Sequence, residues 1–289
     1  MTACAHERAA TSAAWTGRPM APQAAGERAA GASEPLVNCI MLTRWPERRA
    51  MVQHAIEAFA RQDWPCRVLT IVNSGEPCQL SGAFREAGLS GRVVCAPPGT
   101  PIGEKRNLGA SAVADAQFIA SFDDDDYCLP CRLRAQVERL GGDAVWLSAS
   151  RKFVALHTLG NIVGFEYGRC FGAGMIRAEI ARELRWPPID YCEDQRLYEQ
   201  VLEHPAYGAV GGGRIVEADD LLYVHRRHES NVSAPHRKDL WAGVLPLQLG
   251  GPGAAEGAEA VGAAVAREVE PPWLVDGGRG GGLAAQSDG

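Results

Sequence analysis

Short apolar runs of strand length alternate with segments of helical pattern between residues 36 and 150, and this alternation constrains the fold most. Helices are expected after Pro46, where apolar residues recur at helical spacing, and over residues 107–114 and 132–140. Strands that alternate with helices form a mainly parallel sheet with helices on both faces, so the predicted class is α/β. The strand-like runs are LVNCIML (36–42), RVLTIV (67–72), RVVCA (92–96), QFIASF (117–122) and DAVWLSAS (143–150).

Composition predicts one folded unit between two biased tails. The chain has 289 residues, of which 46% are hydrophobic, enough for a sizeable core. Residues 1–34 are rich in Ala without a sustained period, and residues 246–289 are rich in Gly and Ala. We expect both tails to be disordered, apart from a short helix that residues 254–268 could form. The folded unit is expected over residues 35–245.

Charge and cysteine content exclude several classes of protein. The formal net charge of -6 and the pI near 5.7 argue against a general nucleic-acid binder, which needs a basic surface. The cysteines are scattered and odd in number, so we expect reduced thiols in the cytoplasm rather than a disulfide framework. We expect no transmembrane segment and no secretory signal, because neither pattern of apolar residues occurs.

Four consecutive carboxylates, Asp123 to Asp126, follow the fourth strand-like run in the stretch FIASFDDDDYCLP. Adjacent negative charges repel one another, and at the end of a buried strand they need a positive partner. In parallel sheets, ligands bind outside the carboxyl ends of the strands, which is where this run is expected to lie. The acid run is therefore the first candidate for a functional site.

Four interpretations of the acid run compete, the plainest being a solvated loop. A calcium loop is excluded, because Cys128 and Arg134 stand where its Gly and Glu belong. An aspartyl phosphatase motif is disfavoured, because Asp126 or Tyr127 stands where a Thr or Val is needed. We favour a hard divalent cation, Mg or Mn, that one or two carboxylates hold together with the phosphate oxygens of a nucleotide.

Three other motifs allow two interpretations each. In GEKRNLG, Lys105 and Arg106 could meet a nucleotide at a helix start, or lie at an ordinary exposed helix end. In FGAGMI the glycines either let the backbone approach a sugar or form a tight turn. The pair Cys128 and Cys131 has redox spacing, but the preceding carboxylates would raise the thiol pKa, which argues against a redox role.

Six stretches in a fixed order resemble the family 2 inverting glycosyltransferases over residues 36–233. Each stretch alone is weakly specific, whereas their order and spacing together are specific. The resemblance implies one domain of the GT-A fold, a Rossmann-like, mainly parallel sheet flanked by helices. The stretches are CIMLT with a following helix that ends RQDWP, LTIVNSG, GEKRNLGASAVADAQFIASFDDDD, FGAGMI, CEDQRL and YVHRRHESNVS.

The resemblance also implies roles for individual residues. Asp123 and Asp125 match the acids of the Asp-x-Asp (DxD) motif that approach the ribose and the metal, and Asp124 is a neighbouring nucleotide contact. Asp194, the second acid of CEDQRL, matches the catalytic base, and His228 matches the remaining metal or diphosphate contact. Contacts with the nucleotide-sugar are further expected from Thr43, Asn73, Lys105, Arg106, Asn107 and Glu193. Glu193 could instead be a helix-start acid that interacts with the helix dipole.

The chemistry of sugar transfer needs residues of these types. A cation bound by Asp125 would stabilise the charge left on the departing diphosphate. A carboxylate such as Asp194 would remove the proton of the incoming hydroxyl, and one base without a second nucleophilic carboxylate implies inversion. The expected partners are a nucleotide-sugar donor, Mn or Mg, and an acceptor that is a glycan, a lipid-linked molecule or a small molecule. A peripheral contact with a membrane is compatible with this, and nucleic acid is not an expected partner.

Two departures from the family pattern leave the donor open. Asn73 stands where many members have an acid that reads the uracil ring, and an amide donates as well as accepts hydrogen bonds. The loop MLTRWPE lacks the usual Pro before Thr43 and places Trp45 near the base site. UDP-, GDP- and dTDP-sugars therefore all remain candidates.

Two alternative functions remain beside the transferase. One is a nucleotidyltransferase that makes nucleotide-sugars, although the loop TRWPERRA lacks the glycines such an enzyme typically has there. The other is a catalytically inactive nucleotide-sugar-binding module, which the intact acids disfavour.

Overall fold

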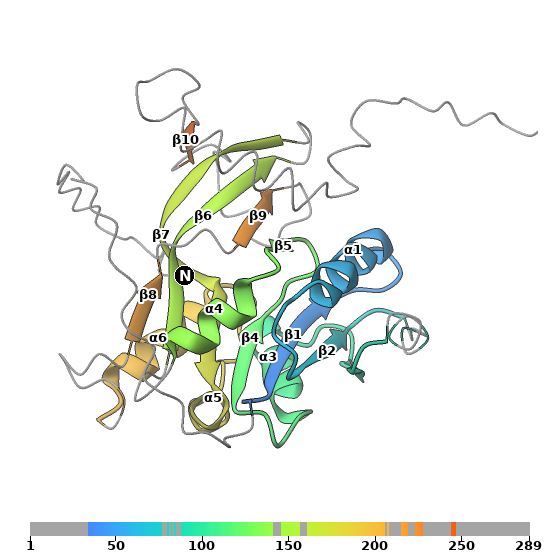
Figure 1. Cartoon of the computed structure of the whole chain (residues 1–289). Coiled ribbons are helices and arrows are strands. Elements are labelled where there is room, and N and C mark those ends of the chain that lie inside the picture. The colour runs from blue at the N-terminus through green and yellow to red at the C-terminus, as the bar shows by residue number, and fades with distance from the viewer. Residues whose placement is uncertain are drawn as a thin grey trace, which may run out of the picture. The chain divides into compact units, whose positions relative to one another are not determined.

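The computed structural model describes residues 34–76, 80, 82, 84, 88–140, 146–156, 161–205, 207, 215–218, 223–227 and 244–246. The predicted tails 1–34 and 246–289 lie outside this part of the chain except for one residue each, and the expected helix over residues 254–268 lies wholly outside it. The helices (Figure 1) are α1 (Arg49–Ala60), α3 (Ile102–Ser111), α4 (Arg132–Arg139), α5 (Ala178–Leu184) and α6 (Glu193–Glu203). The strands are β1 (Val37–Thr43), β2 (Arg67–Asn73), β3 (Gly91–Cys95), β4 (Phe118–Ser121), β5 (Tyr127–Cys128), β6 (Trp146–Leu156), β7 (Asn161–Arg177), β8 (Ile215–Ala218), β9 (Tyr223–Arg227) and β10 (Val244–Pro246).

The described strands form one sheet in the order β3-β2-β1-β4-β7-β6-β9-β5, with β10 beside β7 and β8 beside β6. The first four strands of this order are parallel, and β7 joins β4 in the antiparallel direction. Because the four parallel strands point the same way, their carboxyl ends meet at one edge. The mainly parallel α/β sheet predicted from the sequence is confirmed.

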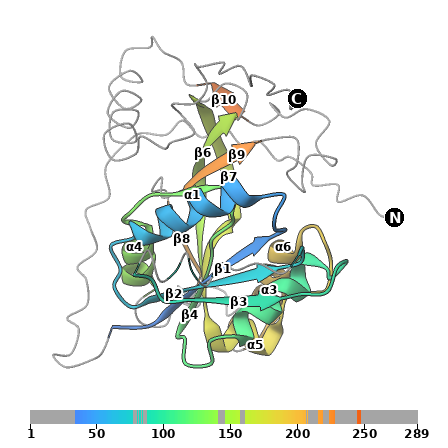
Figure 2. The ribbon, with the colours of Figure 1, turned by 90° about the vertical axis from the view of Figure 1, so that its right-hand side faces the viewer.

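Helices cover both faces of the parallel strands (Figure 2). Val37, Cys39 and Met41 of β1 pack in one core cluster with apolar residues of α1 and α4. Ile40 belongs to a second cluster with residues of α3, α5 and α6. Successive side chains of a strand point to opposite faces, so a strand buried on both faces reads as a continuous apolar run. This burial explains why β1, β2 and β4 appear as apolar runs in the sequence.

Two local predictions were wrong. Helix α3 begins at Ile102 rather than at residue 107, because its first turn packs on the chain near residue 187 instead of forming an apolar stripe. A Cβ added at Gly103 would lie 1.8 Å from the carbonyl oxygen of Pro187, so this contact requires glycine. The tight-turn interpretation of FGAGMI is also wrong, since residues 171–176 lie within the long strand β7.

None of the helices in the described part of the chain combines the length and apolar character that a membrane-spanning segment needs. The pair Cys128 and Cys131 shows no sign of a redox motif. Cys128 is a buried free thiol, and burial raises its pKa to about 11. A protonated, buried thiol is a poor nucleophile, which agrees with the prediction from the sequence.

Candidate functional site

The acid run lies where the parallel strands end. It follows β4, which pairs with β1 through the register of Ile40 with Ser121. Thr43 and Asn73 lie opposite each other at the carboxyl ends of β1 and β2. The carboxyl edge of a parallel sheet is the usual ligand site of such folds, and here polar residues from three neighbouring strands collect there.

Arg106 of α3 is the centre of one half of the site. Its Nε lies 3.1 Å from Glu193 Oε1, its Nη2 lies 3.2 Å from Asp194 Oδ2 and its Nη1 lies 3.5 Å from Asp123 Oδ1. The guanidinium is buried, and the three carboxylates together raise its pKa although burial opposes this. Arg106 thus joins the acid run to the start of α6 and remains charged.

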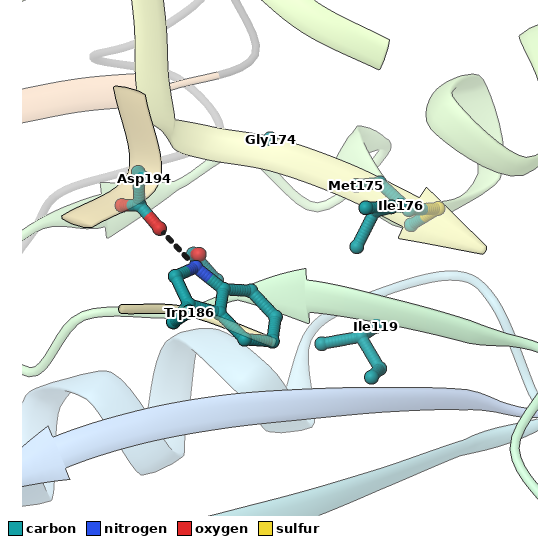
Figure 3. Close-up of a pocket in the computed structure, with 7 residues that line it drawn as sticks. Ile119, Gly174, Met175, Ile176, Trp186 and Asp194 are labelled. Atoms are coloured by element: carbon teal, nitrogen blue, oxygen red, sulfur yellow. Dashed lines mark hydrogen bonds between the residues drawn. The ribbon is translucent and has the colours of Figure 1, made fainter. Parts of the chain in front are cut away.

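Asp194 has a pKa suited to proton transfer near neutral pH. Burial raises its pKa to about 6, while Arg106 and a hydrogen bond from Trp186 oppose the shift. Trp186 Nε1 donates to Asp194 Oδ1 at 2.7 Å, and both residues line a small cavity beside the paired strands β4 and β7 (Figure 3). The apolar cavity walls, Ile119 and Ile176 among them, keep water away from one side of the carboxylate.

Arg48 is the centre of the other half of the site. It lies in the turn between β1 and α1, and its Nη1 and Nη2 reach Asp124 Oδ1 at 2.5 Å and Asp125 Oδ2 at 2.9 Å. Burial still raises the pKa of Asp124 to about 7, with Asp125 adding to the effect and Arg48 opposing it. Thr43 also lowers that pKa, although its hydroxyl and Asp124 Oδ2 are buried without a hydrogen bond of ordinary geometry.

Asp123 and Asp126 complete the run. Burial raises the pKa of Asp123 to about 7 despite Arg106, yet its side chain is still 23% exposed and can reach a ligand. Asp126 accepts a hydrogen bond from Tyr223 and lies 3.1 Å from His225 Nδ1. The last acid therefore anchors β9 to the site. A Cβ on Gly172 would lie 3.5 Å from Asp123 Oδ2, so β7 also passes close to the run.

Two predicted donor contacts use their amides for internal hydrogen bonds. Asn73 Oδ1 accepts from the backbone N–H of Trp45 and of Gly75, each at 3.0 Å, and its Nδ2 donates to the Glu76 carbonyl. Asn107 Nδ2 donates to the Trp186 carbonyl at 2.8 Å, and its Oδ1 accepts from the Trp186 N–H at 2.9 Å. Both amides position neighbouring loops.

The N-terminus of α3 is occupied by the protein's own groups. The Ile102 N–H donates to Asp190 Oδ1 and the Gly103 N–H to the Ile189 carbonyl, both at 3.0 Å. Lys105 is half-buried in this turn, where burial lowers its pKa and Asp190 opposes the shift. The first N–H groups of α3 thus bind the loop before α6, and the contact of Lys105 and Arg106 with a nucleotide stays a prediction.

The metal prediction is only partly covered by the described residues. Asp125 lies within the acid run, whereas His228 lies outside the described part of the chain. In that part, no three His, Cys, Asp or Glu side chains converge as ligands for a metal ion. The prediction needs one or two carboxylates with the rest of the shell from phosphate oxygens, so it stays a prediction.

Sequence reasoning missed three contributors to the site. Arg48 was included in the loop TRWPERRA but not assigned a role, and Asp126 and Trp186 were not proposed as site residues. The four-acid run itself was the available signal for Arg48 and Asp126, because each carboxylate there needs a partner. Nothing in the sequence indicates which of the many arginines provides it.

Comparison with known proteins identifies the fold. No model of a known protein family and no curated protein matches the chain. Residues 1–349 of S. aureus TarS, solved with UDP-GlcNAc, match 69% of this chain at 17% identity and a TM-score of 0.52. The mannosyltransferase PcManGT from Pyrobaculum calidifontis, solved with GDP-Man and Mn²⁺, matches 85% at 13% identity and a TM-score of 0.52.

These comparisons establish a single domain with the GT-A fold of glycosyltransferases. A further structure of S. aureus TarS matches 67% of this chain at 16% identity and a TM-score of 0.50. The chain spans 37% of that protein, 61% of its residues 1–349 and 73% of the mannosyltransferase, so it covers less than two thirds of either TarS structure.

Proposed function

We propose that the protein is a metal-dependent, inverting glycosyltransferase similar to family 2. It moves a sugar from a nucleoside-diphosphate donor to an acceptor hydroxyl, in the synthesis of a polysaccharide or glycoconjugate. The GT-A fold supports this proposal, as do the nucleotide-sugars bound to TarS and PcManGT. The site geometry adds support of its own.

The observation that carries the proposal is that, among the described residues, carboxyl groups outnumber cationic groups at the carboxyl edge of the sheet. Five carboxyl groups, those of residues 123–125, 193 and 194, pair with the guanidinium groups of Arg48 and Arg106, and the carboxyl group of Asp126 lies beside His225. Burial raises the pKa values of Asp123, Asp124 and Asp194, and neighbouring carboxylates add to the shift while the arginines oppose it. An additional cation would stabilise the ionised forms.

A divalent cation fits this group of donors. Carboxylate oxygens are the ligands that Mg and Mn prefer, and Asp124 Oδ2 is a buried oxygen without a hydrogen bond of ordinary geometry to any described group. Asp125, with Asp124 beside it, would hold the ion, and His228 is a further proposed ligand. When bound, the cation supplies electrostatic stabilisation to the departing diphosphate. Asp123 would then contact the ribose of the donor.

Asp194 is the proposed catalytic base. A base works best when its pKa lies near the operating pH, and a pKa of about 6 meets this condition. Its Oδ2 faces Arg106 and its Oδ1 accepts from Trp186, so the carboxylate is held in one orientation. A single positioned base that deprotonates the acceptor hydroxyl favours direct displacement and inversion.

Nucleotide binding tests the proposal. The melting temperature is measured with UDP, GDP and dTDP, each with and without Mn²⁺, for the wild type and for Asp125→Ala. A ligand that binds only the folded state stabilises it by about 2.7 kcal/mol at 100 times its dissociation constant. We expect at least one nucleotide to stabilise the wild type more strongly with Mn²⁺, and Asp125→Ala to lose that increment.

Asp63→Ala is the matched control, because Asp63 pairs with Arg134 at the surface, where its side chain is 41% exposed. It should keep the full metal increment. An unchanged increment in Asp125→Ala would remove the metal assignment. Hydrolysis of a nucleotide-sugar in the presence of Mn²⁺ would exclude the inactive module. Release of pyrophosphate from a sugar phosphate and a nucleoside triphosphate would favour the nucleotidyltransferase instead.

A further inference from the structure

Arg48 bridges the two carboxylates at the centre of the acid run. Its Nη1 lies 2.5 Å from Asp124 Oδ1 and its Nη2 lies 2.9 Å from Asp125 Oδ2, so each arm of the guanidinium holds a different acid. Hydrogen bonds between charged groups are stronger than neutral ones, and the planar fork of Arg fixes their geometry. The Arg48 side chain is 18% exposed, so part of it is open to solvent and to an entering ligand.

The fold holds the Arg48 turn in place from the neighbouring strand. Asn73, at the end of β2, accepts a hydrogen bond from the Trp45 N–H at 3.0 Å, and the Glu76 N–H donates to the Trp45 carbonyl at 2.7 Å. A Cβ at Gly75 would lie 2.1 Å from that carbonyl, so only glycine permits this approach. These contacts fix the backbone of the turn that carries Arg48 beside the acid run.

Arg48 and a divalent cation would compete for the same oxygen atoms. Asp125 Oδ2 is already the acceptor of Arg48, and Asp125 is the residue proposed to hold the metal. Two cations on adjacent carboxylate oxygens repel each other unless further negative charge enters with the second. The diphosphate of a nucleotide brings that charge, and a guanidinium can bind phosphate oxygens with both of its arms.

We propose that Arg48 is the resident counter-ion of Asp124 and Asp125. When a nucleoside diphosphate enters, Arg48 releases Asp125 to a divalent cation and then binds the diphosphate itself. The inference rests on the proposed function and adds a specificity for ligands that carry a diphosphate. Its consequence is positive coupling: metal alone binds weakly, and metal and nucleotide each increase the affinity of the other by the same factor.

Arg49, the first residue of α1, provides a matched control next to Arg48. It is exposed, and its guanidinium lies over the Trp45 ring at 5.7 Å from the ring centroid. Replacing Arg49 by Gln removes the same charge from the neighbouring position while leaving the bonds of Arg48 to the acid run intact. A purely long-range effect of charge would therefore appear in both variants, whereas an exchange of partners would appear only in the Arg48 variant.

The experiment measures Mn²⁺ binding to the full chain by the electron paramagnetic resonance signal of the free ion. The proteins are wild type, Arg48→Gln, Arg48→Lys, Arg49→Gln and Asp125→Ala, first without nucleotide and then with UDP or GDP. Without nucleotide, Arg48→Gln should bind Mn²⁺ about 10-fold more tightly than wild type, the scale of one charge-assisted hydrogen bond. Arg49→Gln should match wild type.

The affinity for nucleotide should change in the opposite direction to the affinity for Mn²⁺. UDP or GDP in the presence of Mn²⁺ should bind Arg48→Gln about 10-fold more weakly, because the diphosphate loses a charged partner. Arg48→Lys keeps the charge but cannot span two carboxylates, so its Mn²⁺ affinity should lie between those of wild type and Arg48→Gln. This variant also decides the question if Arg48→Gln fails to fold, in which case a wild-type Mn²⁺ affinity in Arg48→Lys overturns the inference.

Two kinds of failure can be told apart. If Asp125→Ala loses Mn²⁺ binding but Arg48→Gln binds it no more tightly than wild type, the inference about Arg48 is wrong and the proposed metal site stands. If Asp125→Ala binds Mn²⁺ as wild type does, the metal site of the proposed function is wrong, and the inference is overturned with it. Equal tightening in Arg48→Gln and Arg49→Gln would reduce the effect to long-range charge and also overturn it.

Discussion

The two arginines of the site differ in how deeply the fold encloses them. The side chain of Arg106 is 6% exposed and faces Asp123, Glu193 and Asp194. That of Arg48 is 18% exposed and faces Asp124 and Asp125. A buried guanidinium cannot exchange its partners without exposing charges to an apolar environment. An accessible one can exchange them with a ligand. We therefore expect Arg106 to keep its partners and Arg48 to exchange them.

Removal of Arg106 should have the largest effect. Arg106→Gln leaves Glu193 and Asp194 buried without their common cation, and loss of one partner from a buried ion pair costs about 3–5 kcal/mol. Arg48→Gln should cost less than Arg106→Gln, because Arg48 pairs with two carboxylates rather than three and its side chain is 18% exposed against 6% for Arg106. Unfolding in urea at neutral pH measures both.

Arg196→Gln is the control for loss of charge, because Arg196 forms an ion pair with Glu199 at 2.6 Å on the surface of α6 and its side chain is 53% exposed. It should change the free energy of unfolding by at most about 1 kcal/mol. If Arg106→Gln and Arg48→Gln destabilise the protein equally, the distinction between a buried and an exchangeable arginine does not hold.

The next largest effect is expected on donor turnover, when the acids that pair with Arg106 are replaced. If Asp194 is the base, Asp194→Asn keeps an oxygen for the Trp186 hydrogen bond but removes the proton acceptor. Donor turnover, to water or to a working acceptor, should fall by about 10²–10⁴-fold, while nucleotide binding persists and the melting temperature does not fall. Glu193→Gln should reduce turnover much less, because its role is to pair with Arg106. Matched losses in the two variants would take the base role away from Asp194.

The parallel half of the sheet could be predicted from the sequence, whereas in the antiparallel half the predicted run 143–150 covers only the start of β6. Strands β1, β2 and β4 are buried on both faces and therefore appear as apolar runs. The hairpin of β6 and β7 extends to residue 177, and its glycines and polar residues resemble a loop in the sequence. The start of α3 was missed because its first turn is held by Asp190 and Ile189 rather than by an apolar stripe.

Within the site, the sequence indicated which residues are charged but not which of them pair. Arg48 and Asp124 are far apart in the chain and meet only because β1 and β4 are neighbours in the sheet. Asn73 illustrates a second difficulty: an amide at that position suits either a base edge or a neighbouring backbone. The contact with Trp45 depends on the path of the loop, which local sequence patterns do not determine.

The smallest effect is a pH dependence that arises in the Arg106 half of the site. Asp194 has a folded-state pKa of about 6 against an ordinary value of 3.8, and the groups that face it are Arg106, Glu193 and Trp186. Between these two values the folded protein binds more protons than the unfolded chain, so this residue makes the free energy of unfolding fall as pH rises. Below pH 3.8 this decrease in the free energy of unfolding is absent, and above about pH 6 it is complete.

Asp194→Asn isolates this contribution, because Asn does not titrate. The free energy of unfolding of the variant minus that of wild type should increase as pH rises from 3.8 to about 6 and then become constant. A change of about 1 kcal/mol would appear as about 2–4 °C in melting temperature for a domain of this size. Arg48→Gln should not show this step, since Arg48 faces other acids. A difference that stays constant across the window would mean that Asp194 titrates alike in the folded and unfolded states. The proposed base would then lack the raised pKa that distinguishes it from an ordinary surface carboxylate.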